Sequence, residues 1–244
     1  MDETIHVSER QVKILQAIIE EYIATAEPVG SETLEKKYSL GVSPATIRNE
    51  MVRLSDMKLL SQPHTSSGRS PTPIALKYYV DHLLKTKDMS VSEEVAVKEK
   101  MWDYRQEVDK LLREATKMLA LKTKALAITA TKDGDLYYAG AANILSMPEF
   151  YDYELTHHLF ETLDESDFWW ALMERQIDPF DILLGEEVEK RGMLSQCGLI
   201  YCKFTTPHMT GAIGVVGPSR LNYSSAIPLV RYIGGLIGEF ASAW

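Results

Sequence analysis

Hydrophobic residues follow a helical spacing over the first part of the chain. Between residues 9 and 25 the apolar positions have the three-and-four spacing of an amphipathic helix: Val12, Leu15, Ile18, Ile19, Tyr22 and Ile23. Ser8 and Gln11 stand at the two key positions of a capping box, in which each side chain bonds to the other's backbone. The pattern predicts a first helix over residues 9–25.

Two shorter helices are predicted after it, separated by proline and glycine. Ser31 is expected to cap the first of them, which runs to about residue 38. Ser43 is expected to cap the second, with Pro44 at its first helical position. The order helix, helix, turn, helix is typical of a helix-turn-helix.

The third helix has an inner and an outer face. At about 100° per residue, its inner face holds Ile47, Met51 and Leu54, with Glu50 and Lys58 at the margins. The residues of the outer face have small side chains near the start of the helix. Further along, this face carries arginine and asparagine, which pair with guanine and adenine edges in the major groove. That set is Ala45, Thr46, Arg48, Asn49, Val52 and Arg53.

The residues after this helix extend the pattern to a winged helix. "KLLSQP" (58–63) is strand-like, "HTSSGR" (64–69) is a turn, and a fourth helix begins after Thr72 with Pro73 at its first position. The turn would be the wing, with Arg69 entering the minor groove. The DNA-binding candidates are therefore Ser43, Thr46, Arg48, Asn49 and Arg53 on the helix, and His64, Thr65, Ser66, Ser67 and Arg69 in the wing.

A charged helical stretch follows, over residues 87 to about 122. It could pack on the C-terminal domain or pair with its twin in a dimer. We favour the first alternative, because its heptad pattern is too irregular for a sustained coiled coil.

From residue 124 the pattern changes to short strands and helices. Strand-like runs are "ALAITAT", "LYYAGAANIL", "DILLGEEV", "QCGLIYCKFT" and "GAIGVVGP"; helical segments lie near 152–164 and 167–175, and a closing helix begins near Tyr223. Strands flanked by helices predict an α+β domain. The predicted organisation is 1–86, a winged-helix DNA-binding domain; 87–122, a helical connector; and 123–244, a regulatory domain.

Charge is unevenly distributed along the chain. The net charge is −9, yet residues 28–86 hold eight Lys and Arg against five Asp and Glu. An acidic body would repel DNA and orient the basic segment towards it.

No apolar stretch of membrane-spanning length and no signal peptide are evident, so we expect a cytosolic protein. Cys197 and Cys202 should face opposite sides of a strand, which disfavours a disulfide.

Sequence patterns for catalysis are weak. "GAIGVVGPSR" lacks the Lys-Ser/Thr of a phosphate loop, and no G-x-S-x-G motif occurs. His157 and His158 are adjacent on a predicted helix and so point apart, which argues against a shared metal. Asp133 and Asp135 lie in a turn without a second carboxylate pair. We expect no catalytic residues, no cofactor and no metal, and hence no enzyme.

The quoted motifs also resemble a known family. "RQVKILQAIIEEYIATAEPVGSETL", "GVSPATIRNEMVRL" and "QPHTSSGRSPT…YYVDHLL", with "YYAGAANILSMPEF" and the ending "MTGAIGVVGPSRLNYSSAIPLVRYIGGLIGEF", resemble the heat-inducible transcription repressor family HrcA. The resemblance implies a winged helix-turn-helix followed by a reduced GAF-like α/β domain that supports dimerisation. It implies a homodimeric repressor of chaperone genes on an inverted-repeat DNA operator, with a GroEL-type chaperonin as a further partner. Family members have a longer middle, for which little room remains between Leu119 and Tyr137.

Two alternatives stay open. In one, a small molecule in the GAF-like domain sets operator affinity, in a pocket lined by Tyr137, Tyr138, Trp169, Trp170 and Tyr201, although such aromatics are more often core. In the other, the winged helix contacts a protein. The outward basic residues of the third helix argue against that role.

Overall fold

A computed structural model describes residues 7–64, 67–175, 178–190 and 192–241 of the chain. The chain divides into two compact units, Met1–Leu84 and Lys85–Trp244. The helices at residues 91–123 belong to the second unit.

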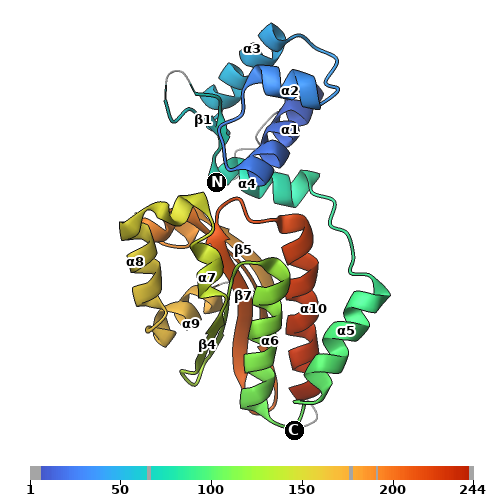
Figure 1. Ribbon diagram of the computed structural model, residues 1–244, viewed down its shortest axis with the longest axis vertical. Helices are drawn as coiled ribbons and strands as arrows, with labels where there is room; N and C mark the ends of the chain where they lie inside the picture. The colour runs from blue at the N-terminus through green and yellow to red at the C-terminus, as the bar shows by residue number, and fades with distance from the viewer. Residues whose placement is uncertain (1–6, 65–66, 176–177, 191, 242–244) are drawn as a thin grey trace. The chain divides into compact units, whose positions relative to one another are not determined.

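The first unit contains the predicted helices, a small sheet and a π-helical turn (Figure 1). Its elements are α1 (Glu9–Thr25), α2 (Ser31–Lys37), α3 (Pro44–Asp56), β1 (Leu60–Ser61), β2 (Ser70–Pro71), α4 (Pro73–Tyr78) and η1 (Tyr79–Leu83). The capping box at Ser8 forms, and Ser43 and Thr72 cap α3 and α4 as predicted. The α+β class and the N-terminal winged helix-turn-helix are confirmed.

Two local predictions for this unit are wrong. Gly30, not Ser31, is the N-cap of α2, because Gly30 has an extended backbone (φ −91°, ψ 154°) and Ser31, a residue only 6% exposed, is the first helical residue. Lys58 lies beyond the end of α3, in a left-handed backbone conformation with φ of 60°, and so is not on the margin of that helix.

Apolar faces of α1, α2 and α3 meet in one core. The buried hydrophobic residues include Ile14, Leu15, Ile18, Ile19, Leu34, Ile47, Met51, Leu54, Leu59 and Leu76. Each is at most 4% exposed, so α3 is fixed by its inner face while its outer face stays in solvent.

The second unit begins with two helices where the sequence indicated one helical stretch. They are α5 (Val91–Trp102) and α6 (Val108–Thr123), separated by residues 103–107. Within this chain α6 packs against α10 and the sheet, and α5 packs against α6 and α10. This packing is the one that the first of the two alternatives predicts for the charged stretch.

The remaining elements form a sheet with helices on both faces. They are β3 (Leu126–Thr131), β4 (Leu136–Ala139), α7 (Ala141–Ile144), η2 (Pro148–Tyr151), α8 (Tyr153–Thr162), α9 (Ser166–Glu174), β5 (Phe180–Leu184), η3 (Gly185–Glu187), η4 (Met193–Gln196), β6 (Cys197–Thr205), β7 (Thr210–Pro218) and α10 (Tyr223–Ala241). The strand-like run at 136–145 ends at Ala139, because Gly140 takes a positive φ of 81° and α7 follows.

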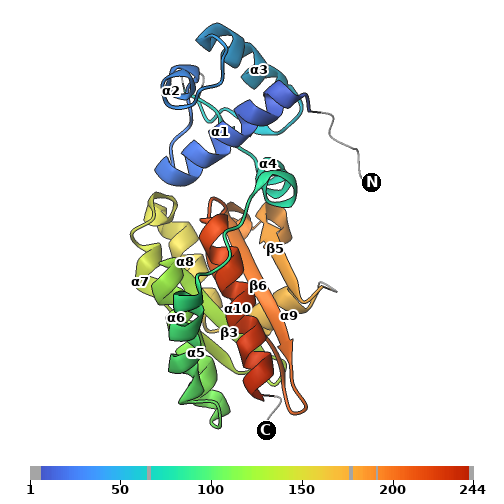
Figure 2. The same ribbon diagram turned by 90° about the vertical axis from the view of Figure 1, so that its right-hand side faces the viewer.

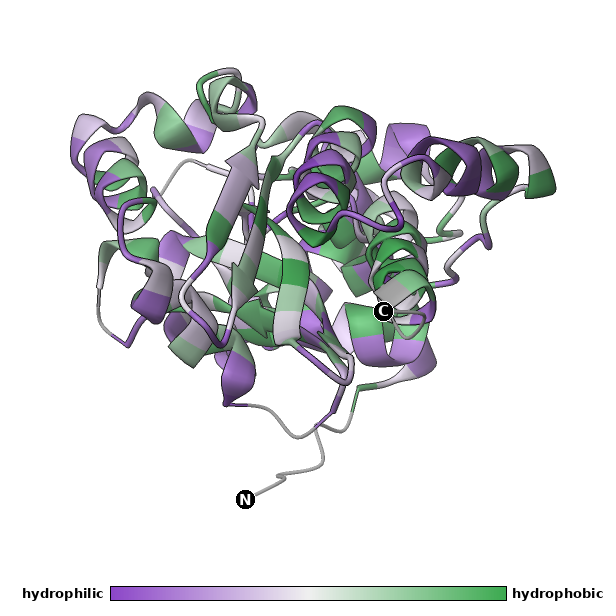
Figure 3. Ribbon diagram, turned by 90° about the horizontal axis from the view of Figure 1, so that it is seen from below, coloured by the Kyte–Doolittle hydropathy of each residue, from purple (hydrophilic) through white to green (hydrophobic). Residues whose placement is uncertain are grey.

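The five strands are antiparallel in the order β4-β3-β7-β6-β5. Figures 1 and 2 show α6 and α10 side by side over one face of the sheet. The opposite face packs against α7, α8 and α9. Covering on both faces explains why β3 is buried along its whole length, and hydrophobic colouring prevails on the strands in Figure 3.

The two cysteines of β6 lie as predicted. Cys197 joins the core on the α8 and α9 side, whereas Cys202 lies beside Gly234 of α10, and both thiols are free. Burial raises the pKa of the Cys197 thiol to about 12. Cys197 is therefore a structural residue of the core.

Candidate nucleic-acid interface

The outer face of α3 is a polar surface on a rigid support. Arg48, Asn49 and Arg53 are exposed, and Val52 is 44% exposed among them. Glu50, in contrast, is 2% exposed and belongs to the buried side of the helix. The helix thus presents guanidinium and amide groups with an apolar contact between them, which suits the edges of bases in a major groove.

Ser43 and Thr46 form the start of this surface. The Ser43 Oγ accepts the Thr46 N–H at 3.3 Å, and the two hydroxyl oxygens are 3.1 Å apart. Ser43 is exposed and Thr46 is half-buried. The Ser43 side chain therefore caps α3, and a DNA contact through either hydroxyl would compete with the bond between the two hydroxyl groups.

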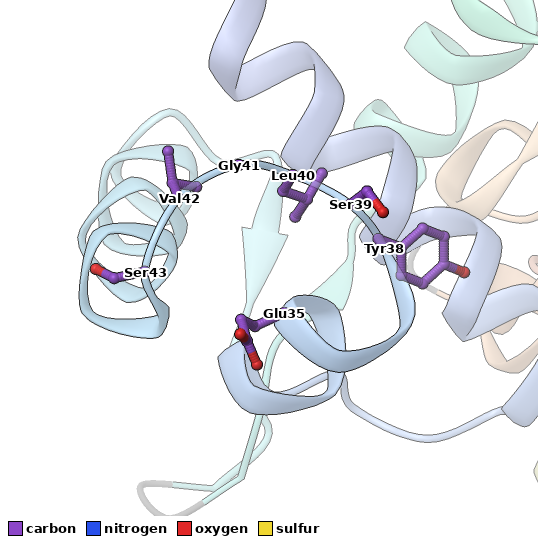
Figure 4. Close-up of a pocket in the computed structure, with 7 residues that line it drawn as sticks. All are labelled: Glu35, Tyr38, Ser39, Leu40, Gly41, Val42 and Ser43. Carbon is purple, nitrogen blue, oxygen red and sulfur yellow. The ribbon is translucent and has the colours of Figure 1, made fainter.

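A surface hollow of about 350 Å³ marks the turn between α2 and α3. Figure 4 shows its lining residues, which come from the end of α2 and the turn: Glu35, Tyr38, Ser39, Leu40, Gly41, Val42 and Ser43. Gly41 has a φ of 68°, which glycine adopts without strain. The carboxylate of Glu35 would repel a phosphate. We therefore regard the hollow as a consequence of how the turn folds, and not as a ligand site.

Glu50 connects α3 to the start of α1. Its Oε1 accepts hydrogen bonds from Nε and Nη2 of Arg10 at 3.1 and 2.5 Å, and its Oε2 accepts one from Nε2 of Gln11 at 3.0 Å. The Nη1 of Arg53 lies 3.4 Å from the same Oε1. The sequence pattern did not reveal this group, because 40 residues separate Arg10 from Glu50.

The electrostatics of this carboxylate follow from its partners. Burial by itself raises the pKa of the Glu50 carboxyl. Hydrogen bonds from Arg10 and Gln11, with the charges of Arg10 and Arg53, outweigh burial and hold the pKa below its ordinary value. Glu50 is therefore ionised at neutral pH, as a buried anion between two guanidinium groups.

The wing is a short antiparallel pair, in which Leu60 faces Pro71 and Ser61 faces Ser70. In its loop, the Ser67 hydroxyl donates to the His64 carbonyl at 2.6 Å and accepts the His64 N–H at 3.0 Å. Ser67 therefore uses its proton to close the turn, while the His64 side chain is exposed. Thr65 and Ser66 lie outside the described residues.

Arg69 lies at the base of the wing. Its main chain forms a bridge to Val29, and its Nε donates to the Ser55 Oγ at 3.1 Å. This contact places the half-buried guanidinium beside the C-terminal part of α3. The structure thus brings Arg69 next to the helix face, at the root of the loop.

The aromatic residues considered for a ligand pocket do not converge. Trp169 and Tyr201 are fully buried in the core on the α8 and α9 side of the sheet, and the Trp169 Nε1 donates to the Thr162 carbonyl. The Tyr137 hydroxyl donates to Asp109 on α6, across the opposite face. Tyr138 is 51% exposed, and Trp170 is half-buried against the core. Their arrangement favours the core interpretation.

Other candidate chemistry is sparse in the described residues. No group of three or more His, Cys, Asp or Glu side chains there has the arrangement of a metal site. The ring of His158 lies 3.1 Å from a Glu189 carboxylate oxygen and 3.9 Å from Glu161, and the ring of His157 lies 3.4 Å from Glu161. Over the same part of the chain, no helix has both the length and the apolar character that crossing a membrane requires.

A helix-turn-helix with a wing, a basic outer face on α3, and a separate α/β unit define a winged-helix transcription regulator. Residues 72–227 match the family model described as "HrcA protein C terminal domain". The match covers more than half of the chain, and the chain belongs to the HrcA family.

Curated relatives extend this similarity to both units. The chain is 26% identical over 336 aligned positions to the heat-inducible transcription repressor HrcA of Symbiobacterium thermophilum, covering 96% of this chain and 98% of the relative. It is 45% identical over 127 residues to HrcA of Carboxydothermus hydrogenoformans, covering 52% of this chain and 37% of that one. With Desulforamulus reducens HrcA the identity is 36% over 195 residues, with coverages of 77% and 54%.

The chain is short for this family. The alignment with the Symbiobacterium protein has 336 positions while this chain has 244 residues, so at least 92 of those positions have no residue here. A solved structure described as a hypothetical protein has a TM-score of 0.80, with 18% identity and coverages of 98% and 99%. That match supports the fold of this shorter form.

Proposed function

We propose that the protein is a heat-inducible transcription repressor that binds an inverted-repeat DNA operator of chaperone genes. The observation that carries this proposal is the outer face of α3, where exposed Arg48 and Asn49 stand on a helix fixed by a fully buried inner face. The names of the family relatives support the repressor function.

Each part of the interface has a separate role in the proposal. Arg48, Asn49 and Thr46 read base edges in the major groove. Arg53 contacts a phosphate or an adjacent base, and the wing with His64 holds the neighbouring backbone. Arg69, at the root of the wing beside the end of α3, enters the neighbouring minor groove.

Two copies of the chain would be needed to read an inverted repeat, because each winged helix reads one half-site. We therefore propose a homodimer. Its C-terminal unit would support dimerisation and would receive the signal, for which a GroEL-type chaperonin is the candidate partner. The cytoplasm is the expected location for such a repressor.

Repression would be steric, by occupation of the promoter. Heat would relieve it by lowering the folded, dimeric fraction, since DNA and the partner subunit stabilise only the folded state. The relatives are repressors by name, and no catalytic step is proposed for this chain.

The test uses anisotropy titrations with Arg48→Ala and Arg69→Ala. Arg48→Ala should lose discrimination between operator and scrambled duplex, because a bidentate base contact contributes about 1–3 kcal/mol of discrimination. Arg69→Ala should weaken binding to both duplexes by a similar factor. The control is Lys100→Ala, which removes an exposed charge on α5. It should change the affinity for neither duplex.

An equal loss on both duplexes for Arg48→Ala would contradict its role in base reading. Sedimentation of the wild-type protein with a full operator and with one half-site tests the dimer. A complex with one chain on the full operator would contradict that part of the proposal.

A further inference from the structure

The described residues place two arginines of different helices on one buried carboxylate. Arg10 belongs to the first turn of α1, Arg53 to the last turn of α3, and Glu50 lies between them. We propose that Arg10 and Arg53, held by Glu50, form a binding site for one backbone phosphate of the bound duplex, which we call the arginine clamp. The inference rests on the proposed function, and it adds a residue outside the helix-turn-helix to the interface.

The geometry favours an anion at this position. Both guanidinium groups approach Oε1 of Glu50, at 2.5 and 3.1 Å from Arg10 and at 3.4 Å from Arg53. Two positive charges and one negative charge leave the group with a net charge of +1. A phosphodiester carries one negative charge, so its arrival would neutralise the cluster.

Both arginines also remain accessible. The Arg10 side chain is 52% exposed and that of Arg53 is 65% exposed, while that of Glu50 is 3% exposed. A guanidinium carries five N–H donors in a fork that matches a phosphate. In the described part of the chain, Glu50 accepts from Nε and Nη2 of Arg10 and from Nη1 of Arg53, so each group keeps further donors for a ligand.

The location of the clamp explains why its ligand would be a phosphate and not a base. At about 100° per residue, Arg53 lies roughly 60° from Glu50 and roughly 40° from Asn49 around α3. The clamp is thus at the edge of the base-reading face, on the side where α1 packs against α3. When a recognition helix lies in the major groove, its flanks and the preceding helix face the sugar-phosphate backbone.

Glu50 acts here as a positioning residue. A long arginine side chain loses conformational freedom on binding, and an anchored one has already lost part of it. The buried carboxylate holds both guanidinium groups in place before DNA arrives. Charge alone would predict the opposite effect, since a carboxylate near DNA repels phosphate. Removal of the Glu50 charge should therefore weaken DNA binding if Glu50 positions the arginines, and should strengthen it if Glu50 only repels phosphate.

The experiment measures binding of the full chain to operator and scrambled duplexes from 50 to 300 mM salt, for wild type, Arg10→Ala, Arg53→Ala, Glu50→Gln and the control Lys100→Ala. Thermal unfolding confirms that each variant is folded at the binding temperature. We expect each arginine variant to lose affinity for both duplexes, roughly tenfold, and to reduce the slope of log K against log salt by about one. Glu50→Gln should weaken binding several-fold, although it removes a negative charge.

Different results would overturn the inference. Unchanged salt slopes for both arginine variants would remove the phosphate contact, and a loss on the operator alone would make it a base contact. Tighter binding by Glu50→Gln would show that Glu50 contributes only repulsion. If Glu50→Gln does not fold, the two arginine variants still decide the phosphate contact. A wild-type protein that binds both duplexes equally would instead contradict the proposed function, independently of the clamp.

Discussion

The main chains of Val29 and Arg69 exchange two hydrogen bonds, from the Val29 N–H to the Arg69 carbonyl at 2.8 Å and from the Arg69 N–H to the Val29 carbonyl at 2.9 Å. This bridge joins the segment before α2 to the root of the wing. It therefore fixes the wing relative to the helix-turn-helix within the first unit.

Gly68 makes this bridge possible, because a Cβ at that position would lie 2.3 Å from the Val29 carbonyl oxygen. Gly68→Ala should open the bridge, lower the thermal midpoint and weaken binding to operator and scrambled duplexes alike. Gly30→Ala is the matched control, because the nearest atom to its Cβ is 4.0 Å away. That control should cost less than about 1 kcal/mol. Equal midpoints for both variants would contradict the role of the bridge.

Glu50 should make the stability of the first unit sensitive to acid. Its folded-state pKa lies below the ordinary value of 4.5, so it stabilises the fold above that pH and loses this contribution as the pH falls through the folded-state pKa. Glu50→Gln should lower stability at pH 7 by about 1–3 kcal/mol and flatten the decline of stability below pH 4.5. The measurement is urea unfolding of the full chain from pH 3 to 7. The exposed Glu32→Gln is the control, and an equal effect of the two changes would refute the prediction.

Thr116 on α6 and Thr129 on β3 share a buried hydrogen bond of 2.7 Å, and the Thr116 hydroxyl also donates to the Leu112 carbonyl. Thr116→Val would leave the Thr129 hydroxyl without this partner and should cost about 1–3 kcal/mol. Thr129→Val should cost less, because Thr116 keeps its bond to Leu112. A double-mutant cycle with urea unfolding measures which substitution costs more. Equal costs for Thr129→Val and Thr116→Val would contradict the inference that Thr116 donates to Leu112 and accepts from Thr129.

Tyr201 is fully buried, and its hydroxyl has no hydrogen-bond partner among the described residues. Tyr201→Phe should leave stability unchanged or raise it by up to about 1 kcal/mol, because it removes a buried polar group without a partner. Tyr223→Phe is the contrasting control, since the buried Tyr223 hydroxyl donates to the Ser219 carbonyl. Thermal unfolding compares the two variants. A larger loss for Tyr201→Phe than for Tyr223→Phe would show that Tyr201 has a polar partner.

Local signals in the sequence predicted much of the first unit. The capping box at Ser8, the Ser43 cap and the inner face through Ile47 are set by neighbouring residues, so the pattern was sufficient for α1 and α3. Ser31 was misassigned because its side chain is buried by tertiary packing, and Gly30 takes the cap position. Intrinsic preference could not reveal that burial.

Long-range contacts were beyond the pattern. Nothing near Arg10 indicates that its partner is Glu50, and the helical projection placed Glu50 only at the margin of the buried face. The break between α5 and α6 falls at "DYRQE", which contains neither glycine nor proline. The position of Arg69 depends on Val29, 40 residues earlier, so its place at the root of the wing required the structure.

The most direct test of operator recognition is an anisotropy titration of the wild-type protein with an inverted-repeat chaperone-gene operator and a scrambled duplex of equal length. It is made at two salt concentrations, with and without a GroEL-type chaperonin. Operator-specific repression predicts tighter binding to the operator than to the scrambled duplex at both salt concentrations, with the preference retained when non-specific binding weakens at high salt. Equal affinity for the two duplexes at both salt concentrations would contradict it.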